Sequence, residues 1–178
     1  SGDRIEGMIK NTIYGIITAK ACGVKNPTLG ILNVYGASQT EMALNQLREG
    51  GYEFKCATSA RADGGAVMRG NDVLQGTPDI MVMDSLTGNV LIKMMSAYTT
   101  GGSFESTGFG YGPGIGKDYN KLILIISRAS GAPLIANAIE YAAQLVRGKV
   151  FEVAKNEFEA ADKAGLSRIL EVSKAAAK

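Results

Sequence analysis

Two short polar segments of the sequence contain the residue types that bind oxyanions. The first, SRASGAP at positions 127–133, follows an apolar run and precedes a long helical pattern. Arg128 offers a planar fork of hydrogen-bond donors to phosphate or carboxylate, and Ser127 and Ser130 add hydroxyl groups beside it. An arginine at this place can instead pair with a carboxylate of the protein itself. From these residues alone, an oxyanion site and an internal ion pair are equally good interpretations.

The second segment, DSLTGN at positions 84–89, lies between a predicted strand and a predicted helix. The free N–H groups and the positive dipole end of a helix N-terminus attract anions. A simpler interpretation is that Asp84 or Ser85 caps the helix and that Gly88 allows the turn. For this segment taken alone, capping is the favoured interpretation because it accounts for each residue without a ligand.

A third polar segment, ATSARADGG at positions 57–65, contains Ser59, Arg61 and Asp63 and is predicted to be a solvated loop. It follows Cys56, a candidate thiol at the end of a short strand. Buried free cysteines are common as packing residues, and sequence alone does not identify a reactive thiolate. Packing is therefore the favoured role for Cys56, with a reactive thiol as the alternative.

The glycine-rich stretch GFGYGPGIG at positions 108–116 has the composition of a phosphate-binding loop but the wrong neighbours. A dinucleotide-binding loop lies directly between a strand and a helix. Here a strand follows and none of any quality precedes, which argues against a nicotinamide dehydrogenase. The sequence predicts a lid or contact loop, with Phe104, Phe109 and Tyr111 as its apolar anchors.

The composition excludes several classes of function. The chain has no histidine, which removes Ser-His-Asp and Cys-His catalysis and most zinc sites. Its net charge is only +2, with lysines and arginines dispersed among carboxylates, so nucleic-acid binding is not expected. The apolar runs are too short to cross a bilayer, and two cysteines without a CxxC spacing fit the reducing cytoplasm. We expect a soluble cytoplasmic protein.

The hydrophobic pattern predicts alternating helices and strands in one unit over residues 3–178. Helices are predicted at 3–21, 37–51, 89–98, 133–148 and from 149 onward, and strands at 28–36, 52–58, 78–84 and 121–127. This alternation is typical of an α/β fold with a largely parallel sheet covered on both faces. Ligands of such sheets bind at the carboxyl ends of the strands. Segments 84–89 and 127–133 are therefore expected to converge on one pocket.

Several motifs resemble known acyltransferase families. LGILNVYG and PDIMVMDSLTGNVLIKM resemble the phosphate acyltransferase of bacterial phospholipid synthesis, and LIISRASGAPLIANAIEYAAQL is similar to the phosphate acetyltransferases. The most extensive similarity, over about residues 27–148 and including the glycine-rich stretch, is to the alpha subunits of component C of the glycine/sarcosine/betaine reductase complex. By this resemblance, the chain looks like the C-terminal half of a longer acyltransferase-like protein.

The resemblance implies a fold and a reaction. The fold is a two-lobed α/β/α arrangement shared with the isocitrate/isopropylmalate dehydrogenase-like enzymes. The reaction is phosphorolysis of an acetyl thioester to acetyl phosphate in an amino-acid reductase complex, with no metal or redox cofactor. The implied partners are inorganic phosphate, the acetyl thioester, the beta subunit of component C and the other reductase components, and an oligomer is expected.

The resemblance also assigns residues. Ser127 and Arg128 match the acyl-phosphate-binding Ser-Arg pair of the acetyltransferases. Together with the strand-end analysis, the candidate site comprises Arg128 and Ser127 as catalytic residues and Thr87, Gly88, Asn89, Asp84 and Ser130 as phosphate- or acyl-binding residues. The acetyltransferases have an aspartate seven positions after the serine, where this chain has Leu134, so the base is unassigned. A non-catalytic scaffold or docking subunit of the same complex is therefore the alternative function.

Overall fold

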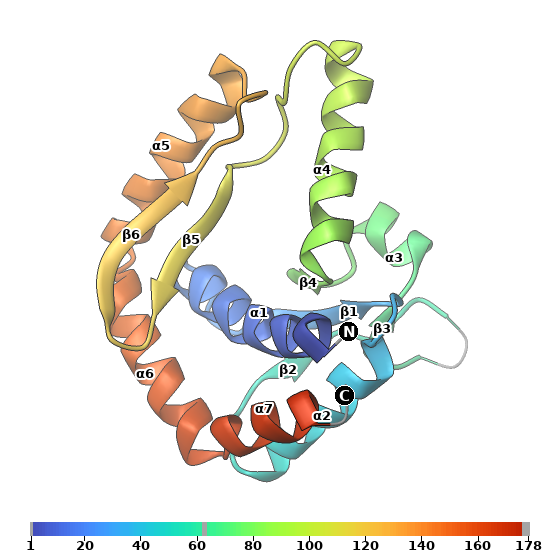
Figure 1. Ribbon diagram of the computed structural model, residues 1–178, viewed down its shortest axis with the longest axis vertical. Helices are drawn as coiled ribbons and strands as arrows, with labels where there is room; N and C mark the ends of the chain where they lie inside the picture. Colours follow the sequence, from blue (N-terminus) through green and yellow to red (C-terminus); the bar gives the residue numbers. More distant parts are fainter. Residues whose placement is uncertain (1, 62–63, 176–178) are drawn as a thin grey trace.

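The structure is a computed structural model and describes residues 2–61 and 64–175 (Figure 1). The helices are α1 (Gly2–Ala21), α2 (Ala37–Glu49), α3 (Gly70–Gln75), α4 (Ser85–Thr100), α5 (Ala132–Arg147), α6 (Val150–Lys163) and α7 (Leu166–Ala175), and the strands are β1 (Thr28–Leu32), β2 (Lys55–Cys56), β3 (Val67–Met68), β4 (Ile80–Val82), β5 (Tyr111–Gly116) and β6 (Tyr119–Ile125). The α/β class and its main helices are as predicted, whereas β3 and α3 were not predicted.

Strand β1 is the centre of a parallel four-stranded sheet. Strands β2 and β3 pair with successive parts of one edge of β1, and β4 pairs with its other edge. Leu29 and Ile31 of β1 therefore each have a paired residue on both sides. Both side chains are buried, as expected for a central parallel strand. The sheet and its helices are consistent with the predicted three-layer α/β/α arrangement, and the specific dehydrogenase-like fold remains a prediction.

Helix α1 forms the centre of the hydrophobic core. Its predicted apolar stripe is fully buried at Met8, Ile9, Ile13, Ile16 and Ile17. The helix packs against β4 and against α2, α5, α6 and α7. The three- and four-residue spacing of these side chains thus determines which elements surround α1. No helix in the described part of the chain is long and apolar enough to span a membrane.

The prediction of an interior parallel strand at 121–127 is wrong. Strand β6 instead pairs antiparallel with β5, and these two strands form a separate sheet. The side chain of Ile125 is 60% exposed and that of Ile123 is 43% exposed. The glycine-rich stretch at 108–116, predicted as a lid or contact loop, also differs from expectation, because most of it forms β5. An apolar run predicts a strand but does not specify its partner or its burial.

Two arms extend to the same side of the main sheet, and a connecting segment links their tips (Figure 1). One arm is α4, and the other is the β5–β6 hairpin with α5 alongside. The connection from α4 to β5, residues 101–110, passes between the tips of the arms. The predicted inner stripe of α5 is only partly covered, since Leu134, Ala138 and Leu145 are buried while Ile139 is 68% exposed.

The join between α5 and α1 should tolerate no side chain at Gly148. A Cβ atom placed there would lie 1.7 Å from the backbone carbonyl oxygen of Ala21. We expect Gly148→Ala to lower the free energy of unfolding by about 1–3 kcal/mol because backbone must move. Gly7→Ala, in α1 with no atom within 4 Å of the added Cβ, should leave stability unchanged or raise it by up to about 1 kcal/mol. Urea denaturation followed by circular dichroism would measure both, and equal effects would contradict the packing described.

Candidate functional site

The DSLTGN segment caps a helix, as its simpler interpretation predicted. Asp84 is the N-cap of α4, and its carboxylate accepts hydrogen bonds from the backbone N–H of Thr87 at 3.1 Å and from the Thr87 hydroxyl at 2.6 Å. Burial alone would raise the pKa of Asp84, but these hydrogen bonds outweigh it and hold the pKa below its usual value. Both donors of Thr87 are therefore engaged within the cap.

The helix begins earlier than the sequence pattern indicated. Because α4 starts at Ser85, Gly88 and Asn89 lie in its first two turns and not in a loop before it. A Cβ atom at Gly88 would make only ordinary contacts with Met83. Asn89 is half-buried, and its side chain is the part of the TGN motif that reaches the rest of the site.

The SRASG segment forms a tight turn between β6 and α5. The Ser130 hydroxyl oxygen accepts the backbone N–H of Ser127 at 2.9 Å, and the Ser127 hydroxyl oxygen accepts the N–H of Ala129 at 3.2 Å. Arg128 is exposed, and within the described residues its guanidinium makes no ion pair with a carboxylate. The described residues therefore do not form the internal ion pair that was one of the two interpretations of Arg128.

A buried glutamate, Glu105, joins this turn to the connection that follows α4. Its backbone N–H donates to the carbonyl of Ala129 at 2.7 Å, and its own carbonyl accepts the N–H of Gly131 at 2.9 Å. The Ser127 hydroxyl donates to the Glu105 carboxylate at 2.5 Å. With the Glu105 side chain only 3% exposed, main chain and side chain together hold the carboxylate against Ser127.

Tyr111 extends the network to α4. Its hydroxyl lies 2.8 Å from the side-chain oxygen of Asn89, 2.8 Å from the ammonium of Lys93 and 3.2 Å from the Glu105 carboxylate. Lys93 also pairs directly with Glu105 at 3.3 Å. Asn89 and Lys93 are four residues apart and so share one face of α4. The polar residues after β4 and those after β6 thus converge through Tyr111 and Glu105.

The network favours an ionised carboxylate at its centre. Burial alone would raise the pKa of Glu105, but hydrogen bonds from Ser127 and Lys93 outweigh it and lower the pKa. The pKa of Lys93 is raised, mainly by its hydrogen bond to Tyr111 and then by Glu105. A carboxylate with an ammonium and two hydroxyl groups around it can orient Ser127, and the exposed Arg128 lies next to that serine in the turn.

Sequence reasoning missed Glu105 and Lys93 and assigned Tyr111 only an apolar role. One signal was available, because Glu105 is the only charged residue between Lys93 and Lys117. A single carboxylate in a glycine-rich connection has no spacing partner, so no motif rule selects it. Its partners come from α4 and from the turn after β6, which only the fold brings together.

The third segment does not join this network. Ser59 is buried, which contradicts the prediction of a solvated loop, because its hydroxyl donates to the buried carboxylate of Asp72 at 2.8 Å. Arg61 is exposed, and Asp63 lies outside the described residues. Cys56 ends β2 at the far edge of the main sheet, where its sulfur accepts from the Arg48 guanidinium at 3.1 Å.

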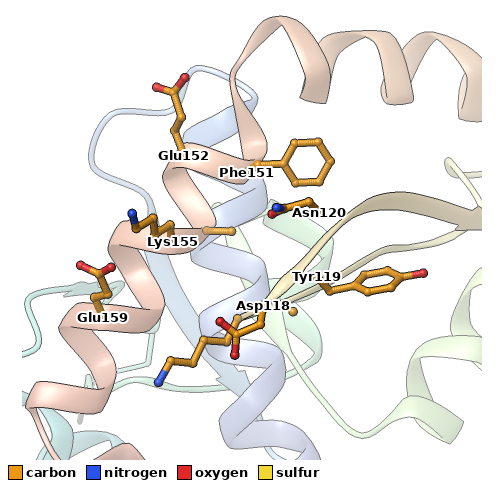
Figure 2. Close-up of a pocket in the computed structure, with 10 residues that line it drawn as sticks. Asp118, Tyr119, Asn120, Phe151, Glu152, Lys155 and Glu159 are labelled. Atoms are coloured by element: carbon orange, nitrogen blue, oxygen red, sulfur yellow. The ribbon is translucent and has the colours of Figure 1, made fainter.

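Two cavities lie outside the Glu105 network. One, of about 460 Å³, is bounded by the β5–β6 turn and α6 (Figure 2). In that view Glu152, Lys155 and Glu159 point away from the hairpin, so their charges do not converge on the cavity. Another, of about 560 Å³, is lined by residues of α1, β4 and β5, among them Tyr14, and by Asp79, which directly precedes β4. Neither cavity carries the side chains of the Glu105 network.

Comparisons with known proteins identify the family. The family model described as "Fatty acid synthesis protein" matches residues 2–178. The chain belongs to this family. Together with two curated relatives, this match confirms the resemblance found in the sequence motifs.

Two curated relatives of this family member have informative names. The chain is 58% identical over 170 residues to the glycine/sarcosine/betaine reductase complex component C subunit alpha of Peptoclostridium acidaminophilum, an alignment covering 96% of this chain and 44% of that protein. It is 31% identical over 120 residues to the phosphate acyltransferase of Phenylobacterium zucineum (strain HLK1), covering 58% of this chain and 32% of that protein. The chain thus spans less than half the length of either relative. No solved structure was found to match it.

The hydrogen bonds of Tyr111 should stabilise the join between the arms. We expect Tyr111→Phe to lower the free energy of unfolding by about 1–2 kcal/mol, because Asn89 loses a partner and Lys93 loses one of its two acceptors. Tyr98→Phe is the matched control, since Tyr98 is 93% exposed, and it should change stability by less than about 0.5 kcal/mol. Urea denaturation measures both, and an equal loss in the two variants would argue against the network.

Asp72 should make stability depend on acid pH. Hydrogen bonds from the backbone N–H groups of Ala60 and Arg69 lower its pKa to about 2, below the unfolded value of about 3.9. Its stabilising contribution is then complete above about pH 4 and disappears as the pH falls through about 2. The stability difference between wild type and Asp72→Asn should therefore shrink over that window in urea titrations. A difference that stays constant from pH 5 to 2 would rule out the lowered pKa.

Proposed function

We propose that this chain provides the phosphate-binding part of an acyl-transfer subunit of an amino-acid reductase complex. The reaction is phosphorolysis of an acetyl thioester to acetyl phosphate. The names of the two relatives support the proposal, one being a component C alpha subunit and the other a phosphate acyltransferase. The partners are inorganic phosphate, the acetyl thioester, the component C beta subunit and the other reductase components.

The observation that carries the proposal is an exposed guanidinium, in a polar turn, that forms no ion pair with any described residue. Arg128 is exposed and makes no ion pair within the described residues, and Ser127 and Ser130 flank it in the same turn. The turn leads into α5, a helix of 16 residues whose N-cap, Gly131, supplies no side-chain cap. The positive end of this helix dipole is therefore available to the same anion as Arg128.

In the proposed reaction, a phosphate oxygen attacks the acetyl carbonyl carbon. A C–O bond forms, the C–S bond breaks, and the leaving thiolate takes a proton. Arg128 holds phosphate oxygens with its fork of donors, and Asn89 offers its amide N–H groups to the acyl oxygen. Thr87 is left out of direct contact because both its donors are engaged by Asp84. The thiol belongs to another polypeptide or to another part of the longer protein.

A non-catalytic docking subunit is the second candidate, and Leu134 favours it. The residue at the position of the acetyltransferase aspartate is buried and apolar, so it cannot transfer a proton. Exposed apolar side chains on the arms, among them Met94, Tyr98 and Ile139, would suit a docking role. Turnover by an Arg128 variant distinguishes this candidate from the proposed enzyme.

The test is phosphate- or arsenate-dependent cleavage of an acetyl thioester by the full complex. We expect Arg128→Ala to lower kcat/KM for phosphate by about 100-fold or more, because a preorganised charge at the anion is lost. Arg147→Ala is the matched control, since Arg147 is an exposed arginine of α5 that pairs with Glu140. Undiminished turnover in Arg128→Ala would remove Arg128 from the proposed site, and absence of turnover in the wild type would favour the docking role.

A further inference from the structure

We propose that Glu105 is a specificity-determining residue that makes this site accept hydrogen phosphate, which carries a proton, and reject sulfate, which carries none. The assignment rests on the proposed function and adds the chemical form of the anion. The residues that carry it are Glu105 and the two donors to its carboxylate, Ser127 and Lys93.

The first step is the direction of the shortest hydrogen bond. An ionised carboxylate accepts hydrogen bonds but cannot donate them. The Ser127 hydroxyl, 2.5 Å from Glu105, must therefore be the donor. The ammonium of Lys93, also a donor only, lies at 3.3 Å from the same carboxylate oxygen. The proton of Ser127 is thus directed inward, away from any ligand.

The second step concerns the hydrogen-bonding capacity that remains on the Ser127 hydroxyl group. A hydroxyl group has one proton and two lone pairs. One lone pair receives the N–H of Ala129 at 3.2 Å, and the other faces the Ser130 hydroxyl at a long 3.3 Å. An anion that displaces this weak contact meets an acceptor. Such a ligand must bring its own donor, which hydrogen phosphate has in its P–O–H group and sulfate lacks.

The third step is charge. Lys93 balances Glu105, and Arg128 in the turn attracts the anion. A fully ionised oxygen placed against Ser127 would meet a lone pair backed by a buried negative charge, with no proton between them. Sites built to bond a ligand hydroxyl strongly reject analogues that lack it, because the buried polar group is then left unpaired.

The fourth step is rigidity, because a carboxylate that moved aside would not discriminate. The Glu105 main chain is fixed on both sides by Ala129 and Gly131. The ring of Phe104 lies over Gly131, where an added Cβ would be 2.2 Å from a ring carbon. Glu105 is thus anchored directly against the turn that carries Ser127.

The experiment compares phosphate and sulfate on component C assembled with the full-length subunit. The selectivity ratio of each variant is the inhibition constant of sulfate divided by the KM for phosphate. We expect the wild type to bind sulfate much more weakly than phosphate, and Glu105→Gln to reduce that ratio by about tenfold or more, chiefly by binding sulfate more tightly. A purely structural defect would not strengthen binding of the wrong anion.

Glu157→Gln is the matched control. Glu157 is also largely buried and accepts from the Tyr52 hydroxyl at 2.7 Å and from Lys20, outside the Glu105 network. The Glu157→Gln variant should leave the selectivity ratio unchanged. Equal selectivity in wild type and Glu105→Gln would overturn the proposal, as would a wild type that does not discriminate. If Glu105→Gln does not fold, Ser127→Ala tests the same contact, since the ratio should fall and an unchanged ratio overturns it.

Calorimetric titration with each anion separates this proposal from the proposed function. Phosphate binding with weak sulfate binding, in a complex that catalyses no phosphorolysis, would reject the reaction and leave the selectivity intact. Phosphorolysis with equal affinity for both anions would retain the reaction and reject the role of Glu105. Failure to bind either anion would reject both.

Discussion

The placement of one carboxylate inside the protein constrains the whole candidate site. A buried charge is costly unless paired and hydrogen-bonded, and Glu105 meets that requirement with Lys93, Ser127 and Tyr111. These partners come from α4, from the turn after β6 and from the start of β5. Satisfying one side chain therefore requires three separate segments to meet, and their meeting brings Asn89 and Ser127 into one network.

The glycine-rich connection makes that meeting sterically possible. At Gly112, which has a positive φ, an added Cβ would lie 2.8 Å from the carbonyl oxygen of Ile123 on β6. Glycine thus allows β5 to lie close against β6 and to start with Tyr111 facing α4. The stretch at 108–116 supplies Tyr111, whose hydroxyl lies between Asn89 of α4 and the Glu105 carboxylate.

Local signals in the sequence were sufficient for some elements and not for others. Four isoleucines of α1, at positions 9, 13, 16 and 17, recur at helical spacing and are buried, and Asp84 caps α4 as its residue type indicates. The apolar run of β6 predicted a strand correctly but not its antiparallel partner, because hydrophobicity does not encode pairing. The contact of Glu105 with Ser127 spans 22 residues and follows from the path of the chain, so no local pattern could reveal it.

The Glu105 network also bears on the choice between an enzyme and a docking subunit. A buried carboxylate paired with a half-exposed lysine is weak evidence for stability, because well-packed apolar residues often serve as well or better. Stability alone therefore explains poorly why a charged pair, Glu105 and Lys93, lies against the turn that carries the exposed Arg128. Leu134 removes one proton-transfer group, but hydrogen phosphate needs positioning and charge balance more than it needs deprotonation. Under the proposed function, a site that selects the protonated form of its anion would provide both without an aspartate at that position.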